Sequence, residues 1–292
     1  MLGLLLLFGC TASPAPEPPA PAERRVLVVG WDGVRADTVE AVPTPNLDRV
    51  GAWGGLSFDA STQLTGPTSS GPGWMSIMTG VEPEEHGVVA NGEYDDRDAR
   101  WPTFFAVAHD AGFRTFAAVH WPEILVEILE PEAVDESALS TDAGVAEAII
   151  EDAIEEDHAV IFGHFDDPDH AGHGTGYSTE NPDYVDAITS SDALLGELLD
   201  AIQDTDQEWL VMVTTDHGGE GTDHGPMEPV YQQIFLGAGV VGGDGGWDMD
   251  GASHMDVYAT VLSFLGLSAD ADDAFPPLRS LPPSALHGDR PR

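Results

Sequence analysis

Arg25-Val-Leu-Val-Val-Gly-Trp-Asp32 is the stretch of sequence that decides the predicted fold. The run from Arg25 to Gly30 is continuous, apolar and rich in β-branched residues, which is the pattern of a strand buried on both faces. Asp32 follows almost at once. We therefore expect a central strand of a covered sheet, with a carboxylate at its carboxyl end.

The same arrangement, an apolar strand followed by Asp and His, occurs twice more in the chain. An acidic, histidine-rich loop from His164 to His173 follows the apolar run 159–162, and Asp216-His217 follows the run 209–213. Two further strands are expected at 116–119 and 234–237, the second of them as a fourth central strand.

Helical patterns alternate with these strands. The longest runs from Pro182 to Ile202 and places its apolar side chains along one stripe. Shorter helices are expected at 43–50, 101–111, 145–154 and 255–265. Strands that alternate with helices indicate a mostly parallel sheet covered on both sides. We therefore predict an α/β fold, a three-layer α/β/α sandwich.

The stretch from Thr65 to Gly80 carries a candidate nucleophile. Its first half is rich in hydroxyls and glycine, and its second half is apolar with helical spacing. Pro72 suits a first helical residue, which makes Ser70 and Gly71 the entrance to a helix. Unpaired N–H groups at such an entrance bind anions, so a hydroxyl there can meet a phosphate. The alternative is that Ser69 and Ser70 only cap the helix.

The composition restricts the partners. The chain of 292 residues has 52 Asp and Glu against 10 Arg and no Lys, for a formal net charge of -42. A nucleic-acid duplex or an anionic membrane would repel such a surface. Phosphate chemistry here must rely on bound cations. The acid excess otherwise indicates a heavily solvated surface, such as one adapted to high salt.

The N-terminus predicts export. Residues 1–10 form an apolar segment too short to span a bilayer, and residues 7–10 resemble the lipobox of bacterial lipoproteins. Cys10, the only cysteine, would carry the lipid. Residues 11–24 are rich in proline and would act as a tether. We expect 25–292 to be one catalytic domain, exported to the periplasm or cell surface, with the lipid on Cys10 as its membrane contact.

The three strand ends together predict a metal site. The carboxyl ends of parallel strands lie along one edge of a sheet, so Asp32, the 164–173 loop and the pair Asp216-His217 should meet there. Carboxylate and imidazole ligands without thiolates suit Zn or Mn. Two clusters of three such ligands would hold two cations about 3.5 to 4 Å apart, which suits displacement at phosphorus.

In this order, the motifs resemble the alkaline phosphatase superfamily, and more narrowly its type I phosphodiesterase/nucleotide pyrophosphatase branch. The resemblance covers most of residues 26–267. Residues 28–37 resemble the family's opening strand with its first metal-binding Asp, residues 70–80 its nucleophile helix, and residues 83–91 the segment after that helix. Residues 168–176 resemble the Pro-Asp-x-x-Gly-His motif, and residues 216–218 a later Asp-His-Gly.

This resemblance implies an alkaline-phosphatase-like fold and a two-metal hydrolase of small-molecule phosphoesters. Ser70 would attack phosphorus to give a phosphoseryl intermediate that water hydrolyses, and Asn91 would bind a phosphoryl oxygen. Two divalent ions are implied, Zn being preferred and Mn the alternative. The implied ligands of the metal beside Ser70 are Asp32, Asp216 and His217, and those of the other metal are Asp169, His173 and His224.

The last of these ligands has a second candidate, His254, as the reserve. His224 matches better, since Gly225 follows it shortly before the apolar run at 234. Four other histidines of this region are expected to be structural or peripheral: His86, His120, His164 and His170.

Sulfatases belong to the same superfamily and are the first alternative, together with phosphomonoesterases. Residues 44–49 are sulfatase-like. Sulfatases, however, place Arg four residues after the nucleophile, where this chain has Trp74, and they begin with paired aspartates, where this chain has Trp31 before Asp32. Both departures favour an unmodified Ser70. A non-catalytic lipoprotein that binds a ligand is the alternative of another class.

Overall fold

Strand β1 (Arg24–Trp31) lies at the centre of a seven-stranded sheet in the computed structural model, which describes residues 24–156, 158–268 and 278. The strand order is β2-β7-β6-β1-β5-β3-β4. The other strands are β2 (Gly54–Ser61), β3 (Thr115–Val119), β4 (Glu136–Leu139), β5 (Val160–Phe165), β6 (Glu208–Thr214) and β7 (Gln233–Val240).

The sheet is mostly parallel, as predicted. β1 pairs in parallel with both β5 and β6, and β3 extends the parallel part as the neighbour of β5 and β4. The residues at 234–237 do form a strand, but β7 runs antiparallel to β6, and β2 runs antiparallel to β7. The expected fourth central strand is therefore an antiparallel one toward the edge of the sheet.

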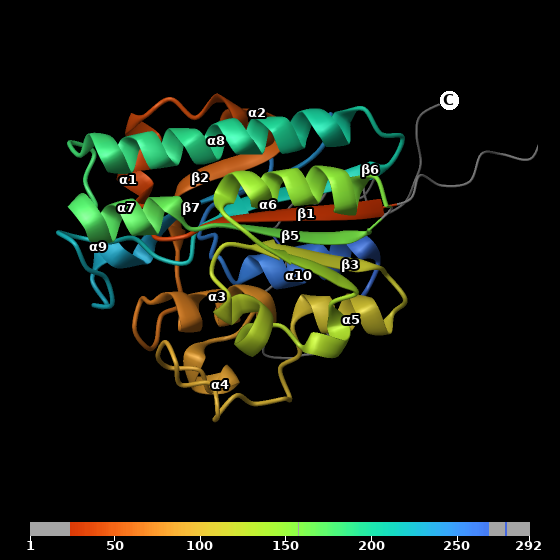
Figure 1. Cartoon of the computed structure of the whole chain (residues 1–292), viewed down its shortest axis with the longest axis horizontal. Coiled ribbons are helices and arrows are strands. Elements are labelled where there is room, and N and C mark those ends of the chain that lie inside the picture. Colours follow the sequence, from red (N-terminus) through yellow and green to blue (C-terminus); the bar gives the residue numbers. More distant parts are fainter. Residues whose placement is uncertain (1–23, 157, 269–277, 279–292) are drawn as a thin grey trace, which may run out of the picture.

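Alternate side chains of β1 enter two separate cores, one on each face of the sheet. Val26 and Val28 belong to one core, whereas Leu27, Val29 and Trp31 belong to the other. Helices α3 (Ser70–Thr79), α5 (Phe104–Asp110) and α10 (Asp256–Leu265) supply the first core. Helices α2 (Pro45–Trp53), α6 (Asp142–Ala148) and α8 (Pro182–Gln203) supply the second. The three-layer α/β/α sandwich is confirmed (Figure 1).

Shorter elements connect these layers. They are α1 (Ala36–Ala41), α4 (Pro83–His86), α7 (Asp167–Thr175), α9 (Pro229–Gln232), the π-helical turns η1 (Ile124–Ile128) and η3 (Ile149–Ile154), and the 3-10 turn η2 (Pro131–Ala133).

Two local predictions need correction. The histidine-rich segment after β5 is a helix and not a loop, because Pro168 stands in the first turn of α7 with acidic residues around it, where they favour a helix start. Helix α3 begins at Ser70, with Ser69 at the N-cap, so Pro72 is its third residue and not its first. The Ser69 side chain makes no capping hydrogen bond.

The lipobox-like segment and nearly all of the proline-rich tether lie outside the described residues, and export remains a prediction. Between residues 24 and 268, none of the helices is long and apolar enough to cross a membrane.

Gly30 of β1 fixes how closely α3 approaches the sheet. A Cβ atom at Gly30 would lie 2.1 Å from the Trp74 ring of α3, and that ring is fully buried. The indole therefore occupies the space that any larger residue at position 30 would need. This packing sets the place of the Trp74 N–H beside the end of β1.

We expect Gly30→Ala to lower the free energy of unfolding by about 1–3 kcal/mol, because over-packing a buried site forces its neighbours to move. Gly174→Ala is the control, since its Cβ would meet nothing within 4 Å in α7 and alanine suits a helix. Urea unfolding measures both. Equal stabilities for the two variants would contradict this view of the packing.

Candidate active site

The ends of three adjacent strands bring the candidate residues together. Asp32 follows β1, α7 follows β5, and Asp216-His217 follow β6, so all three groups lie at one edge of the sheet. The Asp32 N–H donates to the Phe165 carbonyl at 2.8 Å, which ties the end of β1 to the start of α7. The three groups of residues that the sequence predicted to meet therefore lie together in the structure.

Asp32 has one carboxyl oxygen held and the other facing the site. Its Oδ2 accepts hydrogen bonds from Trp74 Nε1 at 2.8 Å and from His164 Nε2 at 3.0 Å. Its Oδ1 lies 3.4 Å from Ser70 Oγ and 3.7 Å from His217 Nε2. The carboxyl plane is thus fixed with a single oxygen directed at the candidate nucleophile.

Asp216 and Asp169 repeat this arrangement. Asp216 Oδ1 accepts from the Gly33 N–H at 3.2 Å, whereas its buried Oδ2 has no hydrogen-bond partner and lies 3.3 Å from His217 Nε2. Asp169 Oδ1 accepts from the Tyr177 hydroxyl at 2.5 Å, and its Oδ2 lies 3.4 Å from His173 Nε2. Each acid therefore presents one oxygen toward a histidine.

The three candidate histidines are also oriented alike. The Nδ1 atoms of His217, His173 and His224 lie 2.9, 2.9 and 3.0 Å from the backbone carbonyls of residues 218, 222 and 68. A carbonyl oxygen only accepts, so each Nδ1–H donates and Nε2 is the ring nitrogen left to face the site. The Nε2 atoms of His173 and His224 lie 3.1 Å apart.

These residues fit divalent cations. The Nε2 atoms of His173 and His224, 3.1 Å apart, are close enough to bind one cation together. At metal–nitrogen distances of about 2.0–2.1 Å, tetrahedral geometry separates two ligand nitrogens by about 3.3 Å. Asp169, His173 and His224 each offer a ligand atom within 4.8 Å of the others, and so do Asp32, Asp169 and His217.

Burial makes this site electrostatically costly without a cation. It raises the pKa of Asp32 well above the ordinary value, and the neighbouring carboxylates of Asp216 and Asp169 raise it further. Burial also raises the pKa of Asp216, with Asp169 adding to the effect. Burial first, and then the nearby His224, lower the pKa of His217 well below its usual range. His217, kept neutral by burial among acids that resist ionisation, belongs to a donor set that a cation would stabilise.

Ser70 lies at the start of α3, buried against these groups. Its Oγ is 3.4 Å from both Asp32 Oδ1 and His217 Nε2. The Gly71 N–H donates to Asn91 Oδ1 at 2.7 Å. This N–H is therefore not free for a phosphoryl oxygen, as a bare helix entrance would be, but the contact orients the Asn91 amide and leaves its N–H₂ group available.

His254, the reserve ligand, belongs to neither of these two ligand clusters. Its Nε2 accepts from the Gln63 N–H at 3.1 Å, inside the protein, and burial lowers its pKa to about 3. His86 contacts Ser76 and is likewise buried, as expected of a structural residue. His164 is the residue that the sequence reasoning missed, because it contacts Asp32 directly. The pairing of β5 with β1 sets His164 level with Gly30, and no local sequence pattern signals that register.

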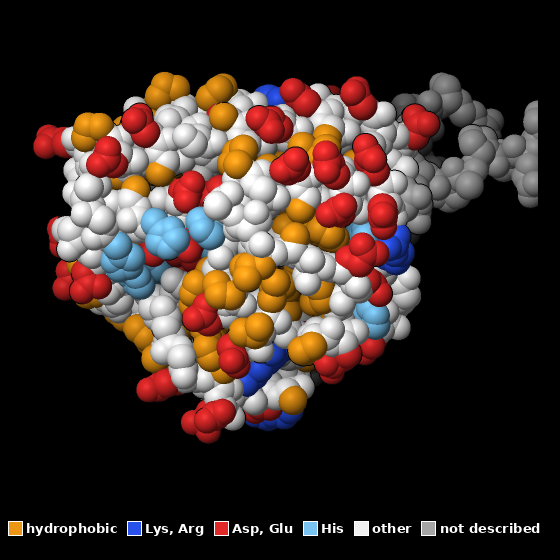
Figure 2. Space-filling model, viewed as in Figure 1, with side chains coloured by type: hydrophobic (Ala, Val, Ile, Leu, Met, Phe, Trp, Pro, Cys, Tyr) orange, Lys and Arg blue, Asp and Glu red, His pale blue; other side chains and the backbone are white. Residues whose placement is uncertain are grey.

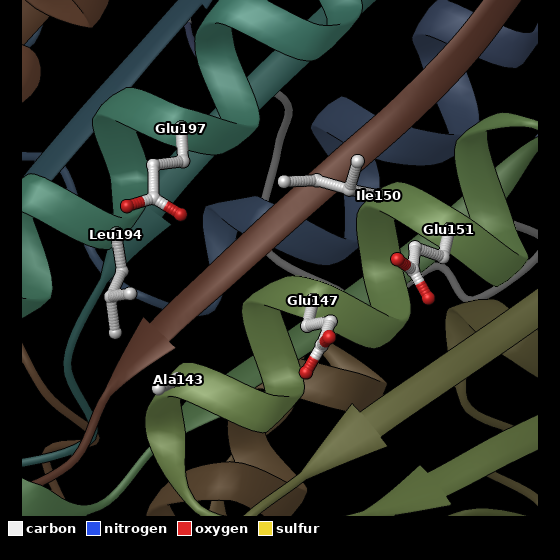
Figure 3. Close-up of a pocket in the computed structure, with 6 residues that line it drawn as sticks. All are labelled: Ala143, Glu147, Ile150, Glu151, Leu194 and Glu197. Atoms are coloured by element: carbon white, nitrogen blue, oxygen red, sulfur yellow. The ribbon is translucent and has the colours of Figure 1, made fainter.

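A shallow hollow between α6–η3 and α8 lies away from these residues (Figure 3). Its lining combines aliphatic side chains with glutamates and contains no histidine or hydroxyl: Ala143, Glu147, Ile150, Glu151, Leu194 and Glu197. Nothing in this lining resembles the candidate active site.

Comparison with known families assigns the chain to a family. Residues 26–235 match the model of the type I phosphodiesterase / nucleotide pyrophosphatase family, which is well over half of the chain. The chain belongs to this family. Curated relatives include ectonucleotide pyrophosphatase/phosphodiesterase family member 5 of Homo sapiens, 25% identical over 221 residues, and family member 7 of Mus musculus, 25% identical over 247 residues.

The alignments cover 68% and 74% of this chain but only 45% and 55% of those two relatives. The chain thus spans about half the length of the curated relatives that it matches.

Solved structures share the fold. Murine ectonucleotide pyrophosphatase / phosphodiesterase 5, solved as an inactive variant in complex with AMP, has a TM-score of 0.67 at 18% identity, over 87% of this chain and 98% of that one. A 2-O GAG sulfatase has a TM-score of 0.69 at 13% identity, over 92% of this chain and 75% of that one. The phosphodiesterase and the sulfatase therefore share this architecture with the chain.

Proposed function

We propose that this chain is a two-metal hydrolase of phosphoesters, of the phosphodiesterase/nucleotide pyrophosphatase type, which acts through a phosphoseryl intermediate. The observation that carries the proposal is the position of Ser70 Oγ, 3.4 Å from both Asp32 Oδ1 and His217 Nε2 at the start of a buried helix. A hydroxyl among candidate metal ligands is an activated nucleophile.

The proposed ligands form two sets. Asp32, Asp216 and His217 would hold the cation beside Ser70, and the second cation would be held by the ligands Asp169, His173 and His224. When bound, two such cations stabilise the charge on the attacking and leaving oxygens of a displacement at phosphorus. We propose Zn, with Mn as the alternative, because the ligands are nitrogen and oxygen atoms without thiolates.

The chain's own residues would then do three things. Ser70 Oγ, its proton passed to solvent, would form a bond to phosphorus as the bond to the leaving oxygen breaks. Water would then add to phosphorus as the bond from phosphorus to Ser70 Oγ breaks, and Ser70 would regain a proton. Trp74 and His164 keep the Asp32 carboxyl in place throughout. Asn91, whose Oδ1 is held by the Gly71 N–H, would donate from its N–H₂ group to a phosphoryl oxygen.

Nucleotide diesters and pyrophosphates are the substrate class that we propose. The family's own description and a neighbour solved with AMP support this choice. The sulfatase alternative draws support from the fold shared with a 2-O GAG sulfatase. The sulfatase alternative is disfavoured because Trp74 occupies the position of the sulfatase Arg and donates its N–H to Asp32.

Ser70→Ala should lower kcat for a phosphodiester by at least about a thousandfold, because removal of a nucleophile leaves only binding and electrostatic effects. Metal content and unfolding free energy should stay near those of the wild type, so that the loss is chemical. Steady-state kinetics on bis-nitrophenyl phosphate measure the effect. Undiminished activity would refute the assignment of Ser70.

Trp74→Phe should weaken metal affinity about 10- to 100-fold, because the variant keeps an aromatic ring but loses the N–H that fixes Asp32. Chelator competition with zinc measures this affinity directly. Trp209→Phe is the matched control, since it removes a buried indole N–H that donates to Thr205 at 2.8 Å, outside the site. Equal affinities for the two variants would contradict the role of Trp74.

A further inference from the structure

Helix α7 carries two Asp/His pairs on neighbouring stripes. Asp169 and His173 form the pair that contributes to the proposed catalytic site, with Oδ2 and Nε2 3.4 Å apart. Asp166 and His170 have the same i, i+4 spacing and the same 3.4 Å separation, one helical stripe away. The second pair has no part in the proposed reaction.

A third histidine from another element faces this second pair. His120 follows β3, and its ring lies 5.2 Å from that of His170, edge to face. His120, Asp167 and His170 each offer a ligand atom within 4.8 Å of the others. Figure 2 shows histidine side chains exposed beside acidic ones on this face of the molecule, over α7.

Asp142 fixes the orientation of the His120 ring. Asp142 is almost fully buried, and its Oδ1 lies 2.8 Å from His120 Nδ1. The same carboxylate accepts from the N–H groups of Asp166 and Asp167 at 2.8 and 3.0 Å, which joins His120 to the start of α7. Nδ1 of His120 also lies 3.8 Å from Asp167 Oδ1. Because the Asp142 carboxylate holds Nδ1 and so fixes the tautomer, a cation bound here would take Nε2 of His120, as in carboxylate–histidine–zinc triads.

We infer that His120, Asp167 and His170 form a third divalent-cation site, separate from the proposed catalytic pair. Two imidazoles and a carboxylate suit Zn²⁺ or a similar transition-metal ion. The cation would join the segment after β3 to α7, which also carries Asp169 and His173. It would also balance acidic charge in a chain that has no lysine. Asp167 and His170 are exposed, so one coordination position would remain open to solvent.

The test counts zinc ions. Metal-free protein is titrated with ZnCl₂ in the presence of a weak competing chelator, and bound zinc is measured by elemental analysis. The Asp167→Asn/His170→Gln variant should bind one equivalent less than the wild type while it keeps its phosphodiesterase activity. His109→Gln is the matched control, because His109 is a half-exposed histidine 3.7 Å from Asp135 on another surface. It should bind as many ions as the wild type.

The difference of one equivalent is independent of the proposed function. If the catalytic pair held no metal, the wild type would bind one ion and the double variant none, and the third site would stand. Equal stoichiometry in the wild type and the double variant would overturn the inference. A crystal of the zinc-loaded wild type should show an anomalous peak between His120 and His170, and its absence would likewise count against the site.

Discussion

The hydrogen bonds from Trp74 and His164 to one oxygen of Asp32 are the constraint on which the site depends. They leave the other oxygen as the part of Asp32 that faces Ser70 and His217. Trp74 can reach Asp32 because Gly30 leaves room for its ring against β1. The packing of α3 on the sheet thus fixes both Ser70, the proposed nucleophile, and Asp32 opposite it. Asp169 and Asp216 are held in the same way, because Tyr177 and a backbone N–H each bind one oxygen of those carboxyl groups.

This arrangement gathers carboxyl groups and imidazoles in a buried region, where burial disfavours the charged form of a carboxyl group. Buried carboxylates near one another raise each other's pKa, so the site is stable as a charged unit only with cations. The chain has few positive side chains with which to supply that charge. We therefore expect metal binding to stabilise this edge of the sheet, since ions that bind only the folded form stabilise it.

Much of the fold could be predicted because the central strands are apolar, short and followed by Asp. The edge strands could not be predicted, because neither has the apolar pattern of a buried strand. β2 reads Gly-Gly-Leu-Ser-Phe-Asp-Ala-Ser, and β4 is largely exposed. The direction of β7 depends on tertiary pairing rather than on its own residues. Helix α7 was hidden by its glycines and its polar composition. For the site, the sequence located the strand-end residues, but the contact of His164 with Asp32 depends on strand register, which no local pattern reveals.

The measurement that tests the account most directly is a substrate panel assayed with Zn and with Mn: bis-nitrophenyl phosphate, nitrophenyl phosphate and nitrophenyl sulfate. The account predicts metal-dependent hydrolysis of the diester, faster than that of the monoester and the sulfate, with loss of activity after chelation and recovery when the metal is returned. Efficient turnover of the sulfate ester, with every phosphoester left intact, would contradict it.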